Sequence, residues 1–293
     1  MATAMILLVG EQPAPNLLPA RRVNPDVTVL VHTEHTRQRA ENLSTILQAN
    51  THCLLCPVVP YDITGVYDGL RGFLRDHVPG HALTFNLTGG TKPMALAAYR
   101  LAEAGEAPFL YFQTEGNRSR LYRYGFDDAA ISLLEMEEIS EALTLDDYLR
   151  SYLGGYETGE PRHALEHDVR AVLQAIPDLE VLWSLRPQGL GALEVDFAVR
   201  LGNQVGVGEV KTAGSKSGID QITAVATQRY LGTYVKKFLV SGKAMHRNNK
   251  DLAEAYEIHV VELVSYDESS TLSGADRRRL KQVLLARMGG RRS

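Results

Sequence analysis

Acidic, basic and histidine residues in the second half of the chain have the types and spacing of a hydrolytic site. The segment HALEH, residues 163–167, has the spacing H-x-x-E-H. In this pattern His163 and His167, one helical turn apart, can hold zinc while Glu166 activates water. A zinc peptidase of this kind needs a third ligand, for which Glu254 or Glu257 would serve. That interpretation leaves the rest of the chain unexplained, so we treat it as the lesser alternative.

A second pattern lies about thirty residues downstream, in LEVDFAVRLGNQVGVGEVKTA. Its alternation of apolar and polar residues predicts two strands joined by a tight turn at Gly202-Asn203. In that register Asp196 lies directly opposite Glu209, with Cβ atoms about 4.5 to 5.5 Å apart. Lys211, two residues beyond Glu209, points to the same face. The hairpin therefore gathers two carboxylates and an ammonium group among apolar neighbours.

Such a group can hydrolyse a phosphodiester. Two adjacent carboxylates repel each other unless a cation neutralises them, which predicts a Mg²⁺ or Mn²⁺ site at Asp196 and Glu209. The metal would polarise the phosphodiester and lower the pKa of bound water, while Lys211 would orient the nucleophile or offset developing charge. The alternative is a solvated hairpin in which glutamate and lysine form ordinary surface ion pairs.

The spacing D-(x)12-E-x-K resembles the PD-(D/E)XK nuclease signature, with Glu194-Val195 in place of the family's loosely kept proline. In that superfamily an acidic residue on the preceding helix commonly completes the site. Glu166 is the matching residue, which makes it a further catalytic residue and metal ligand beside Asp196 and Glu209. The superfamily also often places an accessory polar residue near the next helix, where the candidates are Lys216, Gln221 and Gln228.

Strand-like and helix-like segments alternate in the first half of the chain. Alternation of this kind predicts a parallel sheet with helices on both faces, a Rossmann-like α/β domain. The polar, glycine-containing segments that could bind a ligand follow the first, second and fourth strands, so they would meet at one edge of the sheet. The predicted strands are 5–9, 27–33, 52–59, 82–88 and 109–114.

The segment LTGGTKP is the most informative of these edge segments. A strand ends at Thr88, and Gly89 and Gly90 allow the backbone to turn close to a ligand. Pro93 suits the first turn of the helix that follows, and the exposed amides at its start suit an anion. The spacing is neither that of a Walker A loop nor that of the G-x-G-x-x-G fingerprint.

VGEQPAPNLLP, VHTEHT and NLTGGTKPMALAAY together resemble the CARF domain of type III CRISPR ancillary effectors, particularly the branch that joins CARF to a restriction-type nuclease. The resemblance covers most of the first 125 residues. It implies a two-fold homodimer that binds a cyclic oligoadenylate, commonly cyclic tetra-adenylate, as allosteric activator. The implied ligand contacts are Gln12, Thr33, Thr88, Gly89, Gly90, Thr91 and Lys92.

The two resemblances together predict a cyclic-oligoadenylate-activated, metal-dependent endonuclease that acts on DNA, RNA or both in antiviral defence. A CARF sensor that regulates by binding nucleic acid without cutting it is the alternative. The Asp196, Glu209 and Lys211 set argues against it, because a binding module has no need to concentrate carboxylates near a phosphate chain. A third hypothesis is that the first domain also cleaves its own activator.

Composition and charge agree with this scheme. The 293 residues are 44% hydrophobic and 23% charged, as in ordinary globular proteins, and are enough for two domains. The apolar start is too short for a signal or membrane span, which predicts a cytoplasmic protein. Cys53 and Cys56 are expected to pack as small hydrophobes. The net charge of −4 hides a basic stretch after Asp276 that could bind a polyanion.

The expected domain boundaries follow from these patterns. A CARF-like domain is expected over residues 1–135, a linker over 136–159, a nuclease domain over 160–265 and a basic C-terminal helix and tail over 266–293. The acidic segment that begins at Glu135 is expected to be a helical connection that ends in a glycine-containing break.

Overall fold

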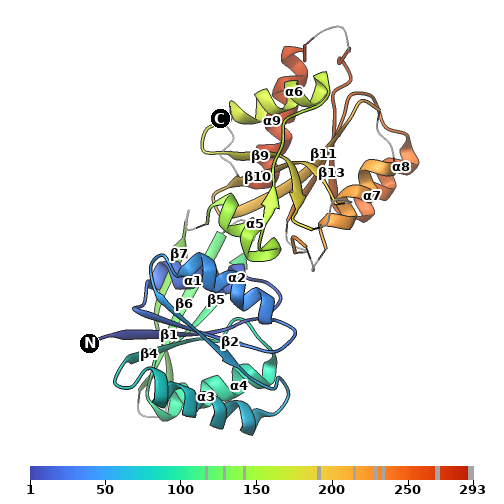
Figure 1. The fold of residues 1–293 in the computed structure, drawn as a ribbon. Coiled ribbons are helices and arrows are strands. Elements are labelled where there is room, and N and C mark those ends of the chain that lie inside the picture. Colours follow the sequence, from blue (N-terminus) through green and yellow to red (C-terminus); the bar gives the residue numbers. More distant parts are fainter. Residues whose placement is uncertain are drawn as a thin grey trace. The chain divides into compact units, whose positions relative to one another are not determined.

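The computed structural model describes residues 1–115, 118–127, 130–140, 143–189, 193–213, 216–227, 230–232, 235–267 and 271–289. The chain divides into two compact units, Met1–Leu143 and the part from Thr144 onward (Figure 1). The division falls inside the segment 136–159 that we expected to be a linker. That segment is not a bare connection, because it contains the end of one strand, a helix and a short further strand.

The first unit is a seven-stranded sheet with the order β3-β2-β1-β4-β5-β6-β7. The first five strands in this order, from β3 across to β5, pair in parallel with their neighbours. The pairs β5–β6 and β6–β7 are antiparallel. The five predicted strands of the first half are confirmed to within a few residues. Its elements are β1 (Thr3–Leu8), α1 (Ala14–Val23), β2 (Val27–His32), α2 (Arg37–Leu47), β3 (His52–Pro57), α3 (Ile63–His77), β4 (Ala82–Asn86), α4 (Lys92–Ala104), β5 (Phe109–Glu115), β6 (Arg118–Asp127) and β7 (Ala130–Ile139).

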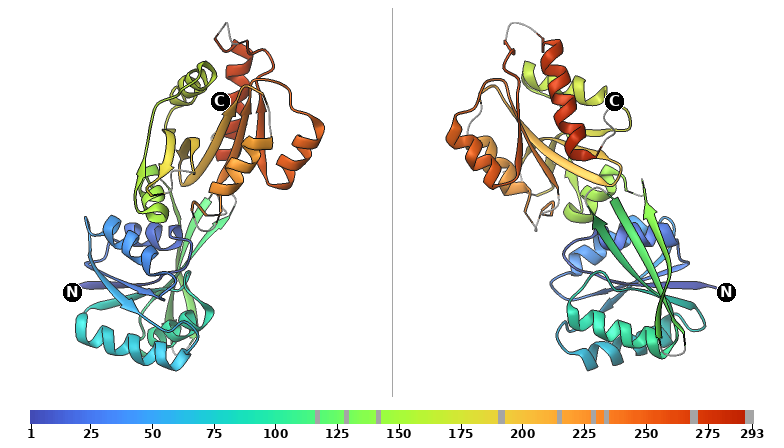
Figure 2. Two further views of the ribbon diagram at one scale, coloured as in Figure 1. Left: turned by 45° about the vertical axis from the view of Figure 1, so that its right-hand side comes forward. Right: turned by 180° about the vertical axis from the view of Figure 1, so that it is seen from behind.

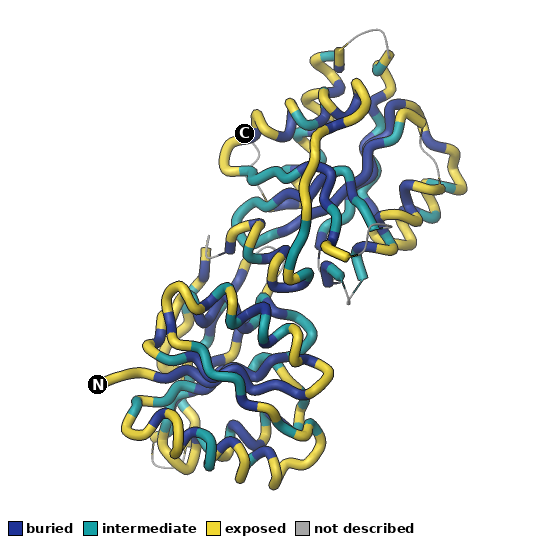
Figure 3. The backbone as a smooth tube through the Cα atoms, in the orientation of Figure 1, coloured by how far each residue is buried: buried dark blue, intermediate teal, exposed yellow. Residues whose placement is uncertain are grey.

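Helices cover both faces of this sheet, α1 and α2 on one side and α3 and α4 on the other (Figures 1 and 2). The central strands are buried on both faces, which is why they read as continuous apolar runs in the sequence. In Figure 3 the centre of the sheet is the most buried part of the unit. The doubly wound, Rossmann-like α/β fold predicted for this half is confirmed.

The acidic segment that begins at Glu135 is the expected helix only in its second part, α5 (Leu145–Leu153), which ends at Gly154. Glu135–Glu138 belong to β7, which pairs with β6 along its whole length, with one irregularity next to Tyr124. Glutamate and leucine are good helix formers, but the preference is worth only a few tenths of a kcal/mol per residue, and pairing with a neighbouring strand overrides it. The carboxylates therefore lie on a strand at the end of the sheet order.

The second unit is built on a six-stranded sheet with the order β13-β12-β11-β10-β9-β8. The pairs β11–β12 and β12–β13 are parallel, and the remaining pairs are antiparallel. Its elements are α5 (Leu145–Leu153), β8 (Tyr156–Glu157), α6 (Ala164–Gln174), β9 (Glu180–Pro187), β10 (Val195–Leu201), β11 (Gln204–Lys211), α7 (Lys216–Val225), β12 (Lys236–Ser241), α8 (Arg247–Ala255), β13 (Ile258–Glu262) and α9 (Gly274–Met288).

Two separate apolar clusters hold this second sheet. One joins α6 and α9 to the side chains of Trp183, Phe197 and Phe238. The other joins α7 and α8 to Leu239 on the opposite face. Helix α9 buries Leu280 in the first cluster, so the basic C-terminal helix is an integral part of the unit. Among the described residues, no helix is long and apolar enough to span a membrane.

Candidate functional site

The predicted hairpin forms with the predicted register. Leu201 pairs with Gln204 across a turn in which Gly202 has φ 60°, a left-handed conformation that favours glycine. The ladder continues to Phe197 opposite Gly208, and one further step places Asp196 opposite Glu209. The turn therefore sets which two carboxylates meet, because each step along the ladder moves both strands by one residue.

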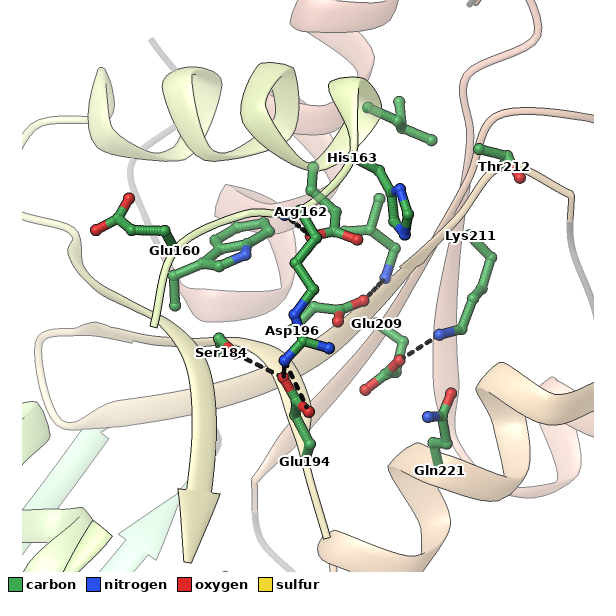
Figure 4. Close-up of a pocket in the computed structure, with 14 residues that line it drawn as sticks. Glu160, Arg162, His163, Ser184, Glu194, Asp196, Glu209, Lys211, Thr212 and Gln221 are labelled. Atoms are coloured by element: carbon green, nitrogen blue, oxygen red, sulfur yellow. Dashed lines mark hydrogen bonds and ion pairs between the residues drawn. The ribbon is translucent and has the colours of Figure 1, made fainter. Parts of the chain in front are cut away.

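Side-chain alternation separates the catalytic candidates from the apolar core. Phe197 and Val210 point into the cluster below α6 and α9. Residues next to them in a strand point the other way, and Asp196, Glu209 and Lys211 line one cavity of about 300 Å³. Figure 4 shows these three side chains together, with other groups entering from the start of α6 and from α7. The structure thus brings the sequence-predicted residues into one pocket.

Specific contacts hold the three charged groups. Lys211 Nζ lies 2.7 Å from Glu209 Oε2, and the side chain of Glu209 is only 2% exposed. Asp196 Oδ2 accepts a hydrogen bond from the backbone N–H of Val210 at 2.7 Å. One ammonium group therefore faces two carboxyl groups.

Burial and mutual repulsion change the pKa values of the carboxyl pair. Burial, followed by the charge of Asp196, raises the pKa of Glu209 to about 8. Burial also raises the pKa of Asp196, against a backbone hydrogen bond and the charge of Lys211. Two close carboxyl groups in a buried site oppose each other's ionisation, so the pair takes up a proton more readily than two free carboxyl groups would.

Glu166 lies in the first turn of α6 and lines the same pocket. Its Oε2 accepts a hydrogen bond from the backbone N–H of Arg162 at 2.8 Å, and the residue is 8% exposed. A carboxylate at the start of a helix satisfies free backbone donors and interacts favourably with the helix dipole. The helix start therefore fixes Glu166 on the rim of the pocket that contains Asp196 and Glu209.

The HALEH histidines have different positions. His163 is the residue just before α6 and lines the pocket, whereas His167 is exposed on the helix. Across the described ranges, no group of three or more His, Cys, Asp or Glu side chains is arranged to hold a metal ion. The zinc interpretation thus gains no support, and Glu166, Asp196 and Glu209 line one pocket without converging on a single point.

Arg162, Ser184 and Glu194 also line this pocket. The sequence suggested no role for Arg162 or Ser184, and it marked Glu194 only as a residue in place of the signature's proline. Ser184 Oγ donates to Glu194 at 2.6 Å, and Arg162 contacts the same carboxylate at 3.0 Å. Ser184 has φ 49° inside β9, a conformation rarely adopted outside glycine. The sequence signals for this group were the position of Arg162, four residues before Glu166, and that of Glu194, two residues before Asp196.

The three accessory polar candidates differ in whether the structure places them at the pocket. Gln221, on α7, lines the pocket opposite the start of α6. Lys216 is the exposed first residue of α7 and is not among the described residues that line the pocket. Gln228 lies outside the described residues. Gln221 is therefore the accessory group that the structure brings to the carboxylates.

In the first unit, the glycine pair after β4 packs against the end of β1. A Cβ atom on Gly89 would lie 2.0 Å from the carbonyl oxygen of Leu8, so only glycine fits. Gly90 has φ 69°, and a Cβ atom on Gly10 would lie 3.1 Å from the Gly90 amide nitrogen. The loops after β1 and β4 therefore touch at the carboxyl edge of the parallel strands, as predicted.

The two threonine hydroxyls of this loop are committed to internal bonds. Thr88 Oγ1 donates to Asn86 at 2.7 Å and accepts from the backbone N–H of Phe112 at 2.7 Å. Thr91 Oγ1 donates to the carbonyl oxygen of Pro60 at 2.8 Å and caps α4 through Met94. These hydroxyls shape the loop, which leaves backbone amides and Lys92 as its groups best suited to an anion.

The remaining expected ligand contacts lie on neighbouring loops. Gln12 follows β1 and is half-buried, and Lys92 is exposed at the start of α4. Thr33 follows β2 and is 6% exposed, with its hydroxyl 3.3 Å from that of Thr36. The sequence did not suggest the hydrogen bond between His35 Nε2 and Glu11 Oε1, 3.1 Å long, which joins the loops after β1 and β2.

Comparison with known proteins gives one family match. The family model described as the Card1 CARF domain matches residues 4–148. A comparison with curated protein sequences finds no match. The matched residues extend from β1 to the start of α5 and include every loop described above for the first unit.

Solved structures extend the similarity to the whole chain. Can2 from Sulfobacillus thermosulfidooxidans, solved in complex with cyclic tetra-adenylate, has a TM-score of 0.72 at 16% identity, covering 96% of both chains. Protein VC1899 from Vibrio cholerae has a TM-score of 0.72 at 12% identity, covering 98% of this chain and 97% of its own. A type III CRISPR defence DNA nuclease activated by cyclic oligoadenylate has a TM-score of 0.61 at 17% identity; the match covers 100% of this chain and 53% of the nuclease.

These similarities concern the fold. The first unit has the Rossmann-like fold of a CARF domain, and its residues 4–148 are similar in sequence to the CARF domain of Card1. Both units together share their arrangement of helices and strands with Can2 and VC1899 over nearly the full length of each chain.

Proposed function

We propose that this protein is a metal-dependent nuclease, activated by a cyclic oligoadenylate, that cleaves DNA, RNA or both in type III CRISPR antiviral defence. The observation that carries the proposal is the buried pocket in which Asp196 and Glu209 face each other beside Lys211. A buried pair of carboxyl groups with raised pKa values is an unfavourable arrangement for stability alone, and such groups are typical of functional sites.

The comparisons support the two halves of the proposal. Residues 4–148 match the Card1 CARF domain, and Can2, with the same fold, was solved with cyclic tetra-adenylate. The type III defence DNA nuclease with a similar fold is activated by cyclic oligoadenylate. On this basis we interpret the second unit as a PD-(D/E)XK restriction-endonuclease-like domain, with Asp196, Glu209 and Lys211 as its signature residues.

The residues of the pocket fit a Mg²⁺ or Mn²⁺ ion. Their oxygen donors are of the type that both ions prefer, and Mg²⁺ commonly binds through one or two carboxylates while it keeps several waters. Asp196 and Glu209 would hold the ion, and Glu166 would complete the set directly or through water. A bound ion supplies a polarised phosphodiester and an acidified water.

The protein side chains would then perform separate tasks. Glu209, once it has lost its proton, forms an ion pair with the ammonium group of Lys211 at 2.7 Å and keeps that group in the pocket. Lys211 would orient the attacking water or offset negative charge on the transferring phosphorus. Glu166, fixed by the backbone of Arg162, would hold the water from the opposite side. Gln221 would contact the phosphate from α7.

The first unit would be the sensor. Backbone amides of Gly89 and Gly90, the start of α4 and Lys92 would bind phosphates of the cyclic tetra-adenylate, with Gln12 and Thr33 contacting it from neighbouring loops. A homodimer with the ligand on its two-fold axis would let one ring contact two copies of this edge. Activation then requires that the ligand bind the active arrangement more tightly than the inactive one.

The test is a cleavage assay with plasmid, single-stranded DNA and RNA substrates. Cleavage should appear only with Mg²⁺ or Mn²⁺ and one member of a panel of cyclic oligoadenylates, and Asp196→Asn or Glu209→Gln should abolish it. Both variants should still bind the activator, because the substitutions lie in the other unit. Activator-dependent binding of nucleic acid without any cleavage by the wild type would instead support the regulator.

A further inference from the structure

A second cavity, of about 480 Å³, lies next to the hydrolytic pocket. Arg162 and Glu194 line both cavities. Arg186 lines the second one together with residues at and just after the end of β9. A nucleic-acid strand carries a phosphate at every nucleotide, so a strand with one phosphate in the hydrolytic pocket has others on either side. The second cavity is therefore in the right place for a neighbouring phosphate.

Two arginines and two glutamates line the second cavity, and both arginines face the same carboxylate, that of Glu194, while Glu157 is the other acid. Arg162 Nη2 lies 3.0 Å from Glu194 Oε1, and Arg186 Nε lies 3.2 Å from Glu194 Oε2. Two guanidinium groups thus face a single carboxylate, which also accepts a hydrogen bond from Ser184 at 2.6 Å. Figure 4 shows Arg162 extended from the start of α6 toward Glu194.

The hydrogen-bonding capacity of this cluster is not used up. Each guanidinium has five N–H donors in a fork that matches carboxylate and phosphate oxygens. Among the described residues, Arg186 Nε is a buried nitrogen that makes no well-aligned hydrogen bond, although Glu194 lies at ion-pair distance. Within those residues, that nitrogen relies on the Glu194 carboxylate alone. The side chains of Arg162 and Arg186 are 57% and 37% exposed, so the remaining donors of their guanidinium groups can reach a phosphate in the cavity.

We propose that Arg162 and Arg186 form a phosphodiester-binding subsite that positions the nucleic-acid strand one or more nucleotides away from the bond to be cleaved. This inference rests on the proposed nuclease function. Glu194 holds both guanidinium forks in place in the free protein, and it occupies the position of the acceptor that a phosphate oxygen takes in the complex. The side chain of Arg162 is 57% exposed, so it can turn from the carboxylate to a strand.

The proposal predicts that removal of an arginine charge and removal of the Glu194 charge change the affinity for nucleic acid in opposite directions. Arg162→Gln and Arg186→Gln should each weaken binding of a labelled single-stranded oligonucleotide about tenfold, the loss of one charge-assisted contact. Each should also reduce the slope of log affinity against log salt by about 0.7. Glu194→Gln should tighten binding severalfold, because it removes the competing anion. A cluster that serves only to brace the fold would not tighten binding when its central carboxylate is removed.

Binding is measured on the full chain in EDTA, with and without cyclic tetra-adenylate and with DNA and RNA strands in separate titrations. Arg150→Gln is the matched control. Arg150 pairs with Asp146 on α5, and neither residue is among the described residues that line either cavity. It should bind within twofold of the wild type. Glu166 keeps its bond in Arg162→Gln, because the donor is the backbone of that residue.

The outcomes separate the subsite from the nuclease. If the wild type cleaves in an Asp196-dependent manner while both arginine variants keep wild-type affinity and salt dependence, the subsite is refuted and the nuclease stands. If no cleavage occurs but the arginine and Glu194 variants shift affinity in opposite directions, the subsite stands on a nucleic-acid-binding protein. Weaker binding by Glu194→Gln, with an unchanged melting temperature, would also overturn the subsite.

Discussion

Replacement of Glu209 by glutamine should change how the stability of the metal-free protein depends on pH. The pKa of Glu209 rises from an ordinary 4.5 to about 8 in the folded chain. Between these values the folded protein holds a proton that the unfolded chain releases, so the free energy of unfolding falls as pH rises. Each pH unit is worth about 1.4 kcal/mol, or roughly 3 kcal/mol between about pH 5.5 and about pH 7.5.

The glutamine side chain imitates the protonated glutamic acid. It has the same shape, carries no charge, can accept from Lys211 through its oxygen and can donate toward Asp196 through its nitrogen. Glu209→Gln should therefore keep the low-pH stability of the wild type and lose most of the decline at higher pH. Above about pH 7 the variant should be more stable than the wild type by about 3 kcal/mol, in the absence of metal.

Urea unfolding followed by circular dichroism, at several pH values and with EDTA present, measures this difference. Glu254→Gln, an exposed site on α8, is the matched control and should run parallel to the wild type. Parallel pH profiles for wild type and Glu209→Gln would refute the argument that Glu209 is forced to hold a proton. With Mg²⁺ added, the wild type should gain stability most strongly at high pH, because metal binding must release that proton.

Three further predictions concern other parts of the chain. Gly89→Ala should destabilise the first unit by about 1 to 3 kcal/mol in urea unfolding, because the new Cβ atom would overlap a backbone oxygen; wild-type stability would disprove this packing. Lys92→Met should weaken cyclic tetra-adenylate binding about tenfold in calorimetry, whereas equal affinity would remove Lys92 from the ligand site. Glutamine at the exposed Arg278 of α9 should weaken nucleic-acid binding at low salt only, and no change there would leave this helix a purely structural role.

Local patterns determined much of the fold. The strands of the first half are continuous apolar runs because a doubly wound sheet is buried on both faces, and the structure has them at the expected places. The hairpin could be predicted equally well. A two-residue turn fixes the register of the two strands, and side chains alternate between the faces with a period of two. The pairing of Leu201 with Gln204 followed directly from the turn at Gly202.

Segments whose local preference was weak could not be predicted in the same way. The run that contains Glu135 has the composition of a helix and the structure of a strand, because pairing with β6 outweighs propensities of a few tenths of a kcal/mol per residue. Likewise, the sequence predicted a basic C-terminal helix and tail outside the nuclease domain. The helix is present as α9, but Leu280 and Leu284 bury it in the core of the second unit.

The sequence by itself determined which residues could do chemistry, because residue type and spacing along two paired strands are local properties. Asp196, Glu209 and Lys211 were identified from the hairpin alone. Tertiary structure decided what surrounds them: the burial that raises the pKa of Glu209, and the arrival of Arg162 and Glu194 at the same cavity. Those effects depend on contacts between segments far apart in the chain, and no local pattern encodes them.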